Sequence, residues 1–372
     1  MAEILFVTWD GGGNLPPALG IALELKARGD SPTVLGHPRQ RAAVEGAGLA
    51  FESFSTARPW NPTRPASTVA ALWGFTGVFT DAGIAADAVA LAGRLGSEVV
   101  VVDCLLFRTL RAVSEAGLRT VSLVHTLQRY LDRSTTRGPV GVVSTLRGAR
   151  PGGAWACADL RLVCALPELD PAAADAVPGT VHVGPVWQGD PAPAHAPAAD
   201  RSRPRVLVSL STTWFPGQEQ TLQTILDAVG PLDLDAIVTT GPAVDPSTLR
   251  AGPNTELRSY VDHGELMPTM SMVVSHGGHA TAMRALSYDL PILVLPMHPL
   301  LDQAMVGQAI ASAGAGQVLA RTATTSQIAA AITHLAGPGP HRTAAACLGD
   351  AIRRQDGAVA AANQIQVLTP TH

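Results

Sequence analysis

A short apolar run that ends at a glycine pair constrains this chain more than any other feature. Residues 272–274 (MVV) are typical of the end of a buried strand, glycines stand at 277–278, and 280–286 is typical of the first turns of a helix. The first N–H groups of a helix lack intrahelical partners and its dipole favours negative charge, while glycine lets an anion approach the backbone. His276 adds a donor and Thr281 a hydroxyl. We therefore expect an anion site at this turn.

The same strand–turn–helix alternation recurs along the chain. Residues 4–9 and 99–102 are continuous apolar runs, as expected of strands that are covered on both faces. Residues 18–28 have helical periodicity, preceded by two prolines that suit a helix start. A second series of strands and helices begins at 205–210. This alternation predicts the α/β class with parallel sheets.

A Pro- and Ala-rich stretch divides the two series. Residues 188–204 contain few large apolar side chains, which is the composition of a linker. The length of 372 residues suits two domains. We predict an N-terminal domain over 1–187, a C-terminal domain over 205–350, and a cleft between them. The tail, 351–372, has a helical pattern, and we expect it to pack back on the N-terminal domain.

Composition excludes several classes of function. Charged residues make up 15% of the chain, the net charge is -4, and there is no basic stripe, which argues against nucleic acid as a partner. No apolar run approaches the roughly 20 residues that span a bilayer, and the N-terminus lacks the basic and apolar regions of a signal peptide. The 4 cysteines form no CxxC pair, so we expect free thiols rather than a zinc site. These features favour a cytoplasmic protein without stable membrane insertion.

Polar residues at strand ends and a local group of aromatic residues are further candidates for a site. Asp10, Asp103 and His125 each stand at or just after the end of a predicted strand, where open α/β sheets bind ligands. Aromatic residues are only 4% of the chain, yet four of them fall within 60–79. They are Trp60, Trp73, Phe75 and Phe79. They would either line an apolar ligand pocket or form ordinary core under a long loop.

The known phosphate motifs do not fit. A dinucleotide fingerprint starting at Gly11 would need glycine at the position of Pro16. A P-loop is excluded because Lys26 is the single lysine and no G-x-x-x-x-G-K-[ST] is present. No group of carboxylates stands out as a Mg²⁺ site. The turn at 275–281 is therefore best interpreted as a metal-free diphosphate site.

Three stretches together carry a family resemblance. Residues 273–281 (VVSHGGHAT), 290–296 (LPILVLP) and the pair Asp302-Gln303 resemble the nucleotide-sugar motif of the GT-B glycosyltransferases. The similar group is the bacterial natural-product (macrolide/polyketide-type) glycosyltransferases of the UDP-glycosyltransferase superfamily. The resemblance covers nearly the whole chain. It implies the GT-B fold, in which two Rossmann-like βαβ domains face each other across a cleft.

The resemblance also implies roles for residues. His276 and the amides around Gly277 would hold the diphosphate, Asp302 and Gln303 would bind sugar hydroxyls, and a helix N-cap is the alternative for that pair. The stretch from Pro296 to Asp302 is two residues longer than usual, which brings His298 near the sugar or shifts Asp302. The donor residues implied are Thr212, Thr213, Tyr260, Val261, His276, Gly277, Gly278, Ala280, Thr281, His298, Asp302 and Gln303.

The implied activity is an inverting, metal-independent glycosyl transfer without a cofactor. The donor would be a TDP- or UDP-sugar, and the acceptor a small aromatic or polyketide-type natural product joined through oxygen or carbon. The acceptor would bind among the four aromatic residues and the segment 128–153. Two alternatives stay open: a nucleotide-sugar 2-epimerase, and a non-catalytic auxiliary partner of another glycosyltransferase. A homodimer is also open.

One position departs from the resemblance. Members that transfer to oxygen carry a histidine in the first turn as general base, oriented by an aspartate that Asp103 matches. Here that position is Asn14, which cannot take a proton. The candidates for the base are Asp10 or Asp103, if burial raises the pKa of the carboxyl, and His125. We rank a carboxylate first. An acceptor that needs little activation by a general base, or a protein without catalytic activity, would also be compatible with asparagine at this position.

Overall fold

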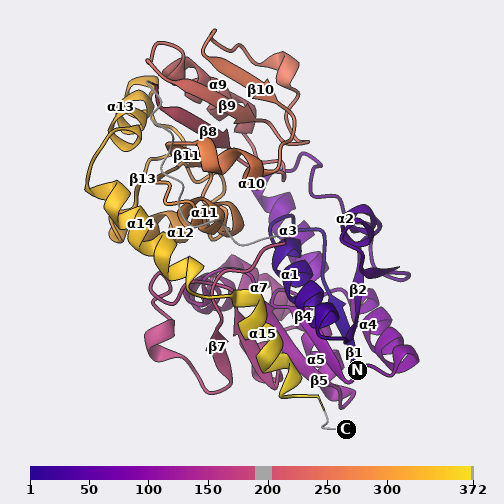
Figure 1. Ribbon diagram of the computed structural model, residues 1–372. Coiled ribbons are helices and arrows are strands. Elements are labelled where there is room, and N and C mark those ends of the chain that lie inside the picture. The colour runs from indigo at the N-terminus through magenta and orange to yellow at the C-terminus, as the bar shows by residue number, and fades with distance from the viewer. Residues whose placement is uncertain (189–202, 370–372) are drawn as a thin grey trace. The chain divides into compact units, whose positions relative to one another are not determined.

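The computed structural model describes residues 1–188 and 203–369, and they form two compact units. The first comprises 1–62, 67–188 and 355–369, and the second 63–66 and 203–354. The predicted linker, 188–204, lies almost entirely outside the described residues. Figure 1 shows the elements of each unit.

The first unit is built on a seven-stranded parallel sheet with the order β3-β2-β1-β4-β5-β6-β7. Its central strands are the continuous apolar runs, and all five residues of β4 are buried. The strands are β1 (Glu3–Val7), β2 (Ser31–Gly36), β3 (Ala50–Ser53), β4 (Val99–Asp103), β5 (Arg119–Val124), β6 (Leu160–Val163) and β7 (Thr180–His182). Their carboxyl ends share one edge because all pairs are parallel.

Helices cover both faces of this sheet, as expected for parallel strands. They are α1 (Leu15–Ala27), α2 (Arg41–Gly46), α3 (Thr68–Phe79), α4 (Ala82–Leu95), α5 (Phe107–Glu115), α6 (Gln128–Tyr130), α7 (Pro139–Leu146), α8 (Pro151–Ala156) and α15 (Gly357–Gln366). Short 3₁₀ or π turns lie at Pro38–Gln40, Leu131–Thr135 and Ala173–Asp175. The segment 128–153 is thus largely helical. The stretch 68–95, which is long and apolar enough to cross a membrane by composition alone, consists of α3 and α4, and α4 contributes buried side chains to this unit.

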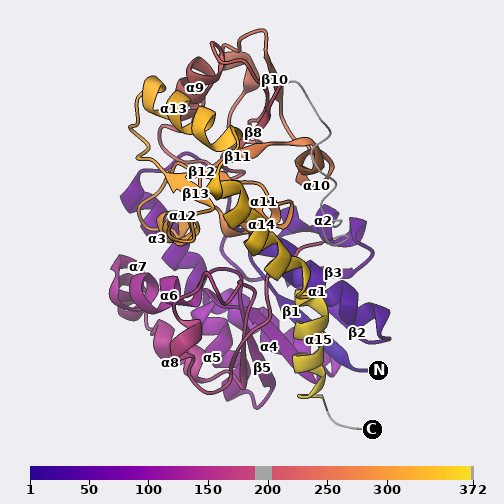
Figure 2. The same ribbon diagram turned by 60° about the vertical axis from the view of Figure 1, so that its left-hand side comes forward.

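The C-terminal helix belongs to the first unit. Figures 1 and 2 both show α15 beside α1. Arg28, which caps α1, donates hydrogen bonds to Asn363 (2.6 Å) and Gln366 (3.0 Å). Asp356 accepts from the amide of Val359 and so starts α15. The sequence predicts one helical tail over 343–367, but the structure forms two helices there because this cap interrupts it.

The second unit has a six-stranded parallel sheet with the order β10-β9-β8-β11-β12-β13. The strands are β8 (Arg205–Ser209), β9 (Asp235–Thr239), β10 (Thr255–Arg258), β11 (Met272–Ser275), β12 (Ile292–Val294) and β13 (Gly316–Val318). The helices are α9 (Gln218–Val229), α10 (His263–Leu266), α11 (His279–Ser287), α12 (Gln303–Ser312), α13 (Thr325–Ala336) and α14 (Pro340–Arg353). Short 3₁₀ turns lie at Pro246–Thr248 and Met267–Thr269.

The order of the strands reverses at one point in each sheet. It reverses between β1 and β4 in the first unit and between β8 and β11 in the second. In open α/β sheets, ligands bind at the carboxyl ends of strands next to such a reversal. The loops after β1, β4 and β5, and those after β8, β11 and β12, are therefore the places to look for a site.

Candidate functional site

The turn between β11 and α11 has the predicted strand–glycine–helix form. Ser275 ends β11, and its hydroxyl accepts a hydrogen bond from the amide of Gly277 at 3.1 Å. Gly277 has a φ of 86°, in the left-handed region. A Cβ at this position would lie 2.5 Å from the carbonyl oxygen of Gln303 and 2.7 Å from Cγ1 of Val294. Glycine is needed here because the backbone turns sharply and also packs directly on α12.

His276 stands at the start of this turn. Burial lowers its pKa to about 4, so the imidazole is neutral near pH 7. Its Nδ1 is buried and has no hydrogen-bond partner within the described residues. The next helix, α11, begins at His279. Its N-cap residue is Gly278, which makes no side-chain hydrogen bond to the helix amides. The turn thus offers uncapped helix amides and a neutral imidazole with unused hydrogen-bonding capacity, which suits an anion.

The loop between β12 and α12 is held by Gln303. Its Oε1 accepts from the amides of Met297 (2.7 Å) and His298 (3.0 Å), and the side chain is buried. Its Nε2 amide is therefore the group left for a ligand. Asp302 occupies the N-cap position of α12, as the alternative interpretation expected, but its side chain makes no cap hydrogen bond to this helix.

An aromatic ring that sequence reasoning missed joins these two loops. Phe215, after β8, lies 5.5 Å from the ring of His298 and 6.4 Å from that of His276, between centroids. Burial, and then the charge of Arg321, lower the pKa of His298. Arg321 follows β13 and donates to the carbonyl of Pro216 at 2.6 Å. The edge therefore carries a cation that the sequence did not indicate.

The remaining predicted donor residues lie after β8 and β10. The amide of Thr213 donates to the hydroxyl of Ser211 at 3.0 Å, and Thr212 is exposed. Tyr260 is 76% exposed, and Val261 beside it is partly buried. Ala280 and Thr281 lie in the first turn of α11. All twelve predicted donor residues thus follow strands of one sheet and come to its carboxyl edge.

In the first unit, Asp103 links two neighbouring strand ends. This carboxylate ends β4 and is 4% exposed. Its Oδ1 accepts from the amide of Leu105 at 2.9 Å, and its Oδ2 accepts from Nδ2 of Asn14 at 2.8 Å. Nδ2 of Asn14 also donates to Trp9 O and Thr8 Oγ1. Both oxygens of Asp103 are therefore engaged.

His125 and Cys104 lie on the other side of Asp103. Nδ1 of His125 is 3.4 Å from Oδ2 of Asp103 and 3.8 Å from Sγ of Cys104. Burial raises the pKa of the Cys104 thiol well above its usual range, with a smaller contribution from Asp103. These three residues are the single group of three metal-ligand side chains found in the part of the chain that is described. Both oxygens of the carboxylate already accept hydrogen bonds, which makes the group a poor fit for a metal.

Asp10 is placed differently. Burial raises the pKa of this carboxyl, and Arg39 partly opposes the rise, with Nε 3.3 Å from Oδ2. The backbone of Asp10 is fixed on both sides, because its amide donates to Nδ1 of His37 and its carbonyl accepts from Nε1 of Trp60 at 2.7 Å. Asp10 thus meets the condition of a raised pKa that we set for a carboxylate base.

Three of the four predicted aromatic residues form a cluster, and the fourth lies apart. Trp60, Phe75 and Phe79 surround Trp9, with centroids 5.8, 6.1 and 5.3 Å from its ring. Trp73 is 55% exposed, and the guanidinium of Arg147 lies 4.3 Å from its ring centroid. The sequence indicated Trp9 only as part of a strand. The cluster sits beside Asp10, at the carboxyl end of β1.

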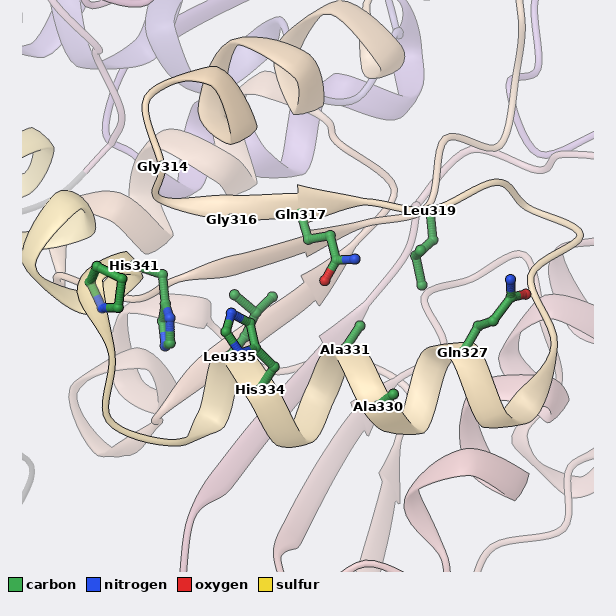
Figure 3. Close-up of a pocket in the computed structure, with 11 residues that line it drawn as sticks. Gly314, Gly316, Gln317, Leu319, Gln327, Ala330, Ala331, His334, Leu335 and His341 are labelled. Atoms are coloured by element: carbon green, nitrogen blue, oxygen red, sulfur yellow. The ribbon is translucent and has the colours of Figure 1, made fainter.

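An open groove lies elsewhere in the second unit. It measures about 680 Å³ and runs between β13 and the helices α13 and α14. Figure 3 shows Gln317 of β13 and His334 of α13 pointing into it. None of the predicted site residues lines this groove. The candidate sites lie instead at the carboxyl edge of each sheet, where the polar groups described above follow the strands.

A family model and several known proteins match parts of this chain. Residues 223–360 match the model of the erythromycin biosynthesis protein CIII-like C-terminal domain. L-demethylnoviosyl transferase of Streptomyces niveus is 29% identical over 161 residues, which are 41% of each chain, so the chain spans well under two thirds of the length of this relative.

Two solved structures cover nearly the whole chain. The glycotransferase of kitacinnamycin has a TM-score of 0.78 at 21% identity, covering 99% of both chains. The spinosyn rhamnosyltransferase SpnG, solved with thymidine diphosphate, has a TM-score of 0.73 at 20% identity, covering 98% of this chain and 100% of that one. The predicted GT-B fold and the resemblance to natural-product glycosyltransferases are confirmed.

Proposed function

We propose that this chain, with its GT-B fold and its erythromycin biosynthesis protein CIII-like C-terminal region, transfers a sugar from a nucleoside diphosphate to a small natural-product acceptor. The donor would be a TDP- or UDP-sugar and the acceptor an aromatic or polyketide-type molecule. The β11–α11 turn carries the proposal, since its uncapped helix amides and the neutral His276 suit a diphosphate. The named relatives support it, because they are glycosyltransferases.

In the second unit, which would bind the donor, each loop would have one chemical role. The amides of Gly278, Ala280 and Thr281, together with the His276 imidazole, would bind the diphosphate. Asp302 and the Nε2 amide of Gln303 would bind sugar hydroxyls, because a pair of polar groups discriminates in favour of a hydroxylated ligand. Tyr260 and Val261 would frame the nucleobase, and His298 would lie near the sugar.

The acceptor half uses the aromatic cluster of the first unit. Trp60 and Phe75 are partly buried and pack on the buried ring of Trp9 beside Asp10, which suits an apolar acceptor whose reactive group is polar. Trp73, being exposed, would bind at the outer margin. The titles of two similar structures name kitacinnamycin and spinosyn, in line with a natural-product acceptor.

The chemistry follows from these groups. The acceptor nucleophile attacks the anomeric carbon in one displacement, the bond to the diphosphate oxygen breaks, and the configuration inverts. The leaving diphosphate gains negative charge, which the helix amides and the His276 imidazole stabilise without reorganisation. On this proposal a metal ion is not needed. Carbon-linked transfer would use the same donor site.

The test is a transfer assay on the full chain. TDP- and UDP-sugars are incubated in EDTA with a panel of phenols and hydroxylated polyketides, and nucleoside diphosphate and glycoside are measured. We expect both products in equal amounts. His276→Ala should lower the rate roughly 10²-fold or more, the scale for losing one stabilising donor. His334 is an exposed histidine on α13, so His334→Ala is the matched control, and it should not lower the rate.

The same assay separates the alternatives. An epimerase converts the donor sugar without any acceptor, whereas a transferase needs one. An auxiliary protein neither releases nucleoside diphosphate nor forms a glycoside with any pair. The names of the relatives do not favour either alternative. Absence of turnover with every donor and acceptor would refute the proposed activity.

A further inference from the structure

We propose that His125, held by the Asp103 carboxylate, is the general base of the transfer. This proposal rests on the proposed function, and it moves the base from the first turn, where Asn14 stands, to the end of β5. It replaces our ranking of a carboxylate base first. The observations that carry it are the engagement of Asp103, the position of His125 and the state of the competing groups.

Asp103 is built to hold other groups rather than to take a proton. The amide of Leu105 and the Nδ2 of Asn14 donate to its two oxygens, at 2.9 and 2.8 Å. Protonating this carboxyl would weaken both hydrogen bonds, and the side chain is too buried for water to replace them. An ionised carboxylate in such a position orients and stabilises a neighbouring cation.

Sheet topology brings the second partner to Asp103. The strand order β1-β4-β5 places Asn14, after β1, and His125, after β5, on opposite sides of the residue that ends β4. Nδ1 of His125 lies 3.4 Å from Oδ2 of Asp103. Hydrogen bonds of catalytic dyads are often long in ligand-free structures and shorten in the complex. The same carboxylate oxygen therefore serves Asn14 and His125.

This contact selects the useful nitrogen of His125. A carboxylate beside Nδ1 favours the tautomer with its proton on Nδ1, which leaves the lone pair on Nε2. Nε2 lies on the opposite side of the ring from Nδ1, so it is the nitrogen left for an acceptor. The side chain keeps 16% of its surface exposed, against 4% for Asp103. His125 is therefore open to an acceptor to an extent that Asp103 is not.

The competing groups are weaker candidates. Asn14 has no basic nitrogen. Cys104 is fully buried, and burial keeps its thiol protonated. Asp10 has a raised pKa, but Arg39 lies 3.3 Å from its Oδ2 and stabilises the charged form, which makes it a poorer base. Asp10 is thus the main alternative that an experiment must exclude.

The proton and the electrons balance in one step. The acceptor O–H gives its proton to Nε2 while its oxygen forms the bond to the anomeric carbon. The bond from that carbon to the diphosphate oxygen breaks, and its electron pair leaves with the nucleoside diphosphate. The imidazolium that results is stabilised by the Asp103 carboxylate and returns the proton to water.

The experiment compares variants of the full chain across pH. His125→Ala should lower kcat by roughly 10²–10⁴-fold with an alcohol acceptor, and should remove the acid limb of the pH profile. Asp103→Asn should lower kcat, while the KM of the donor stays the same, because Asp103 acts through His125. Asp10→Asn should retain the acid limb.

Two further readouts distinguish a base from a structural role. Added imidazole should restore part of the activity of His125→Ala, and the loss should shrink as more acidic phenols are used. The matched control is His182→Asn, which breaks the other buried histidine–aspartate pair of this unit, between His182 and Asp170 at 2.9 Å. It should lower thermal stability without changing the pH profile.

Each outcome has one meaning. If the wild-type chain shows no turnover and binds no nucleoside diphosphate, the proposed function fails. If the wild type turns over and His125→Ala keeps both its rate and its acid limb, the assignment of His125 is overturned while the function stands. Loss of the limb in Asp10→Asn, with no rescue of His125→Ala by imidazole, would assign the base to Asp10.

Discussion

Gly277→Ala should damage the donor loop far more than an ordinary glycine substitution. Gly277 has a φ of 86°, and an added Cβ would lie 2.5 Å from Gln303 O and 2.7 Å from Val294 Cγ1. Gly314 is the matched control in the same unit. It has a φ of 78°, and its added Cβ would meet only Ala344 Cβ, at an ordinary 3.6 Å.

The comparison separates two costs. A left-handed alanine costs about 1–2 kcal/mol at either position. At 277 the alanine also collides with a backbone carbonyl in the first turn of α12, which cannot rotate away, and overpacking of this kind adds about 1–3 kcal/mol. We therefore expect roughly 2–5 kcal/mol for Gly277→Ala, and the smaller figure for Gly314→Ala.

Two measurements check this prediction. Urea unfolding followed by circular dichroism gives the free energies of unfolding, and calorimetric titration with TDP and UDP gives the affinity of the donor site. Gly277→Ala should lose stability and diphosphate binding together, whereas Gly314→Ala should keep its binding. Equal stabilities and equal affinities in the two variants would refute the close approach of the turn to α12 and its role in binding.

Three other predictions use the same protein. Of the four thiols, Cys104 and Cys164 should react with a thiol reagent only after unfolding, because burial raises both pKa values (to about 12 for Cys164), while the exposed Cys347 should react at once. Burial lowers the pKa of His37 to about 4 from 6.5, so the unfolded chain binds the extra proton and stability should fall by about 3 kcal/mol as pH drops from 6.5 to 4. The slope of stability against pH should flatten in His37→Asn, and an unchanged slope would contradict the assignment. Trp60→Ala should raise the KM of the acceptor and leave that of the donor unchanged, and equal changes in both would argue against an acceptor role.

The β11–α11 turn was predictable because the residues that form it are contiguous in the sequence. The apolar run, the glycine pair and the helix of 272–286 are contiguous, and the structure forms β11, the turn and α11 from them. The strand orders of the two sheets were not predictable in the same way. The strands β3 (Ala50–Ser53) and β13 (Gly316–Val318) are short and only partly buried, so they carry little apolar pattern.

The groups that sequence reasoning missed depend on contacts between distant positions. Phe215 packs on His276 and His298, and Arg321 reaches Pro216, across 61 to 105 positions in the chain. The shared use of Asp103 by Asn14 and His125 likewise requires the neighbouring order of β1, β4 and β5. Such contacts follow from the packing of strands, which periodicity and spacing do not encode.

The most direct test of the central claim is a calorimetric titration of the full chain with TDP and UDP in EDTA. The β11–α11 turn predicts saturable binding of at least one of the two to a single site, with a Kd of about 1 µM–1 mM, the usual range for substrates. His276→Ala should weaken it at least about tenfold, or 1.4 kcal/mol. Absence of binding to both nucleotides, or equal binding in His276→Ala, would contradict the diphosphate site.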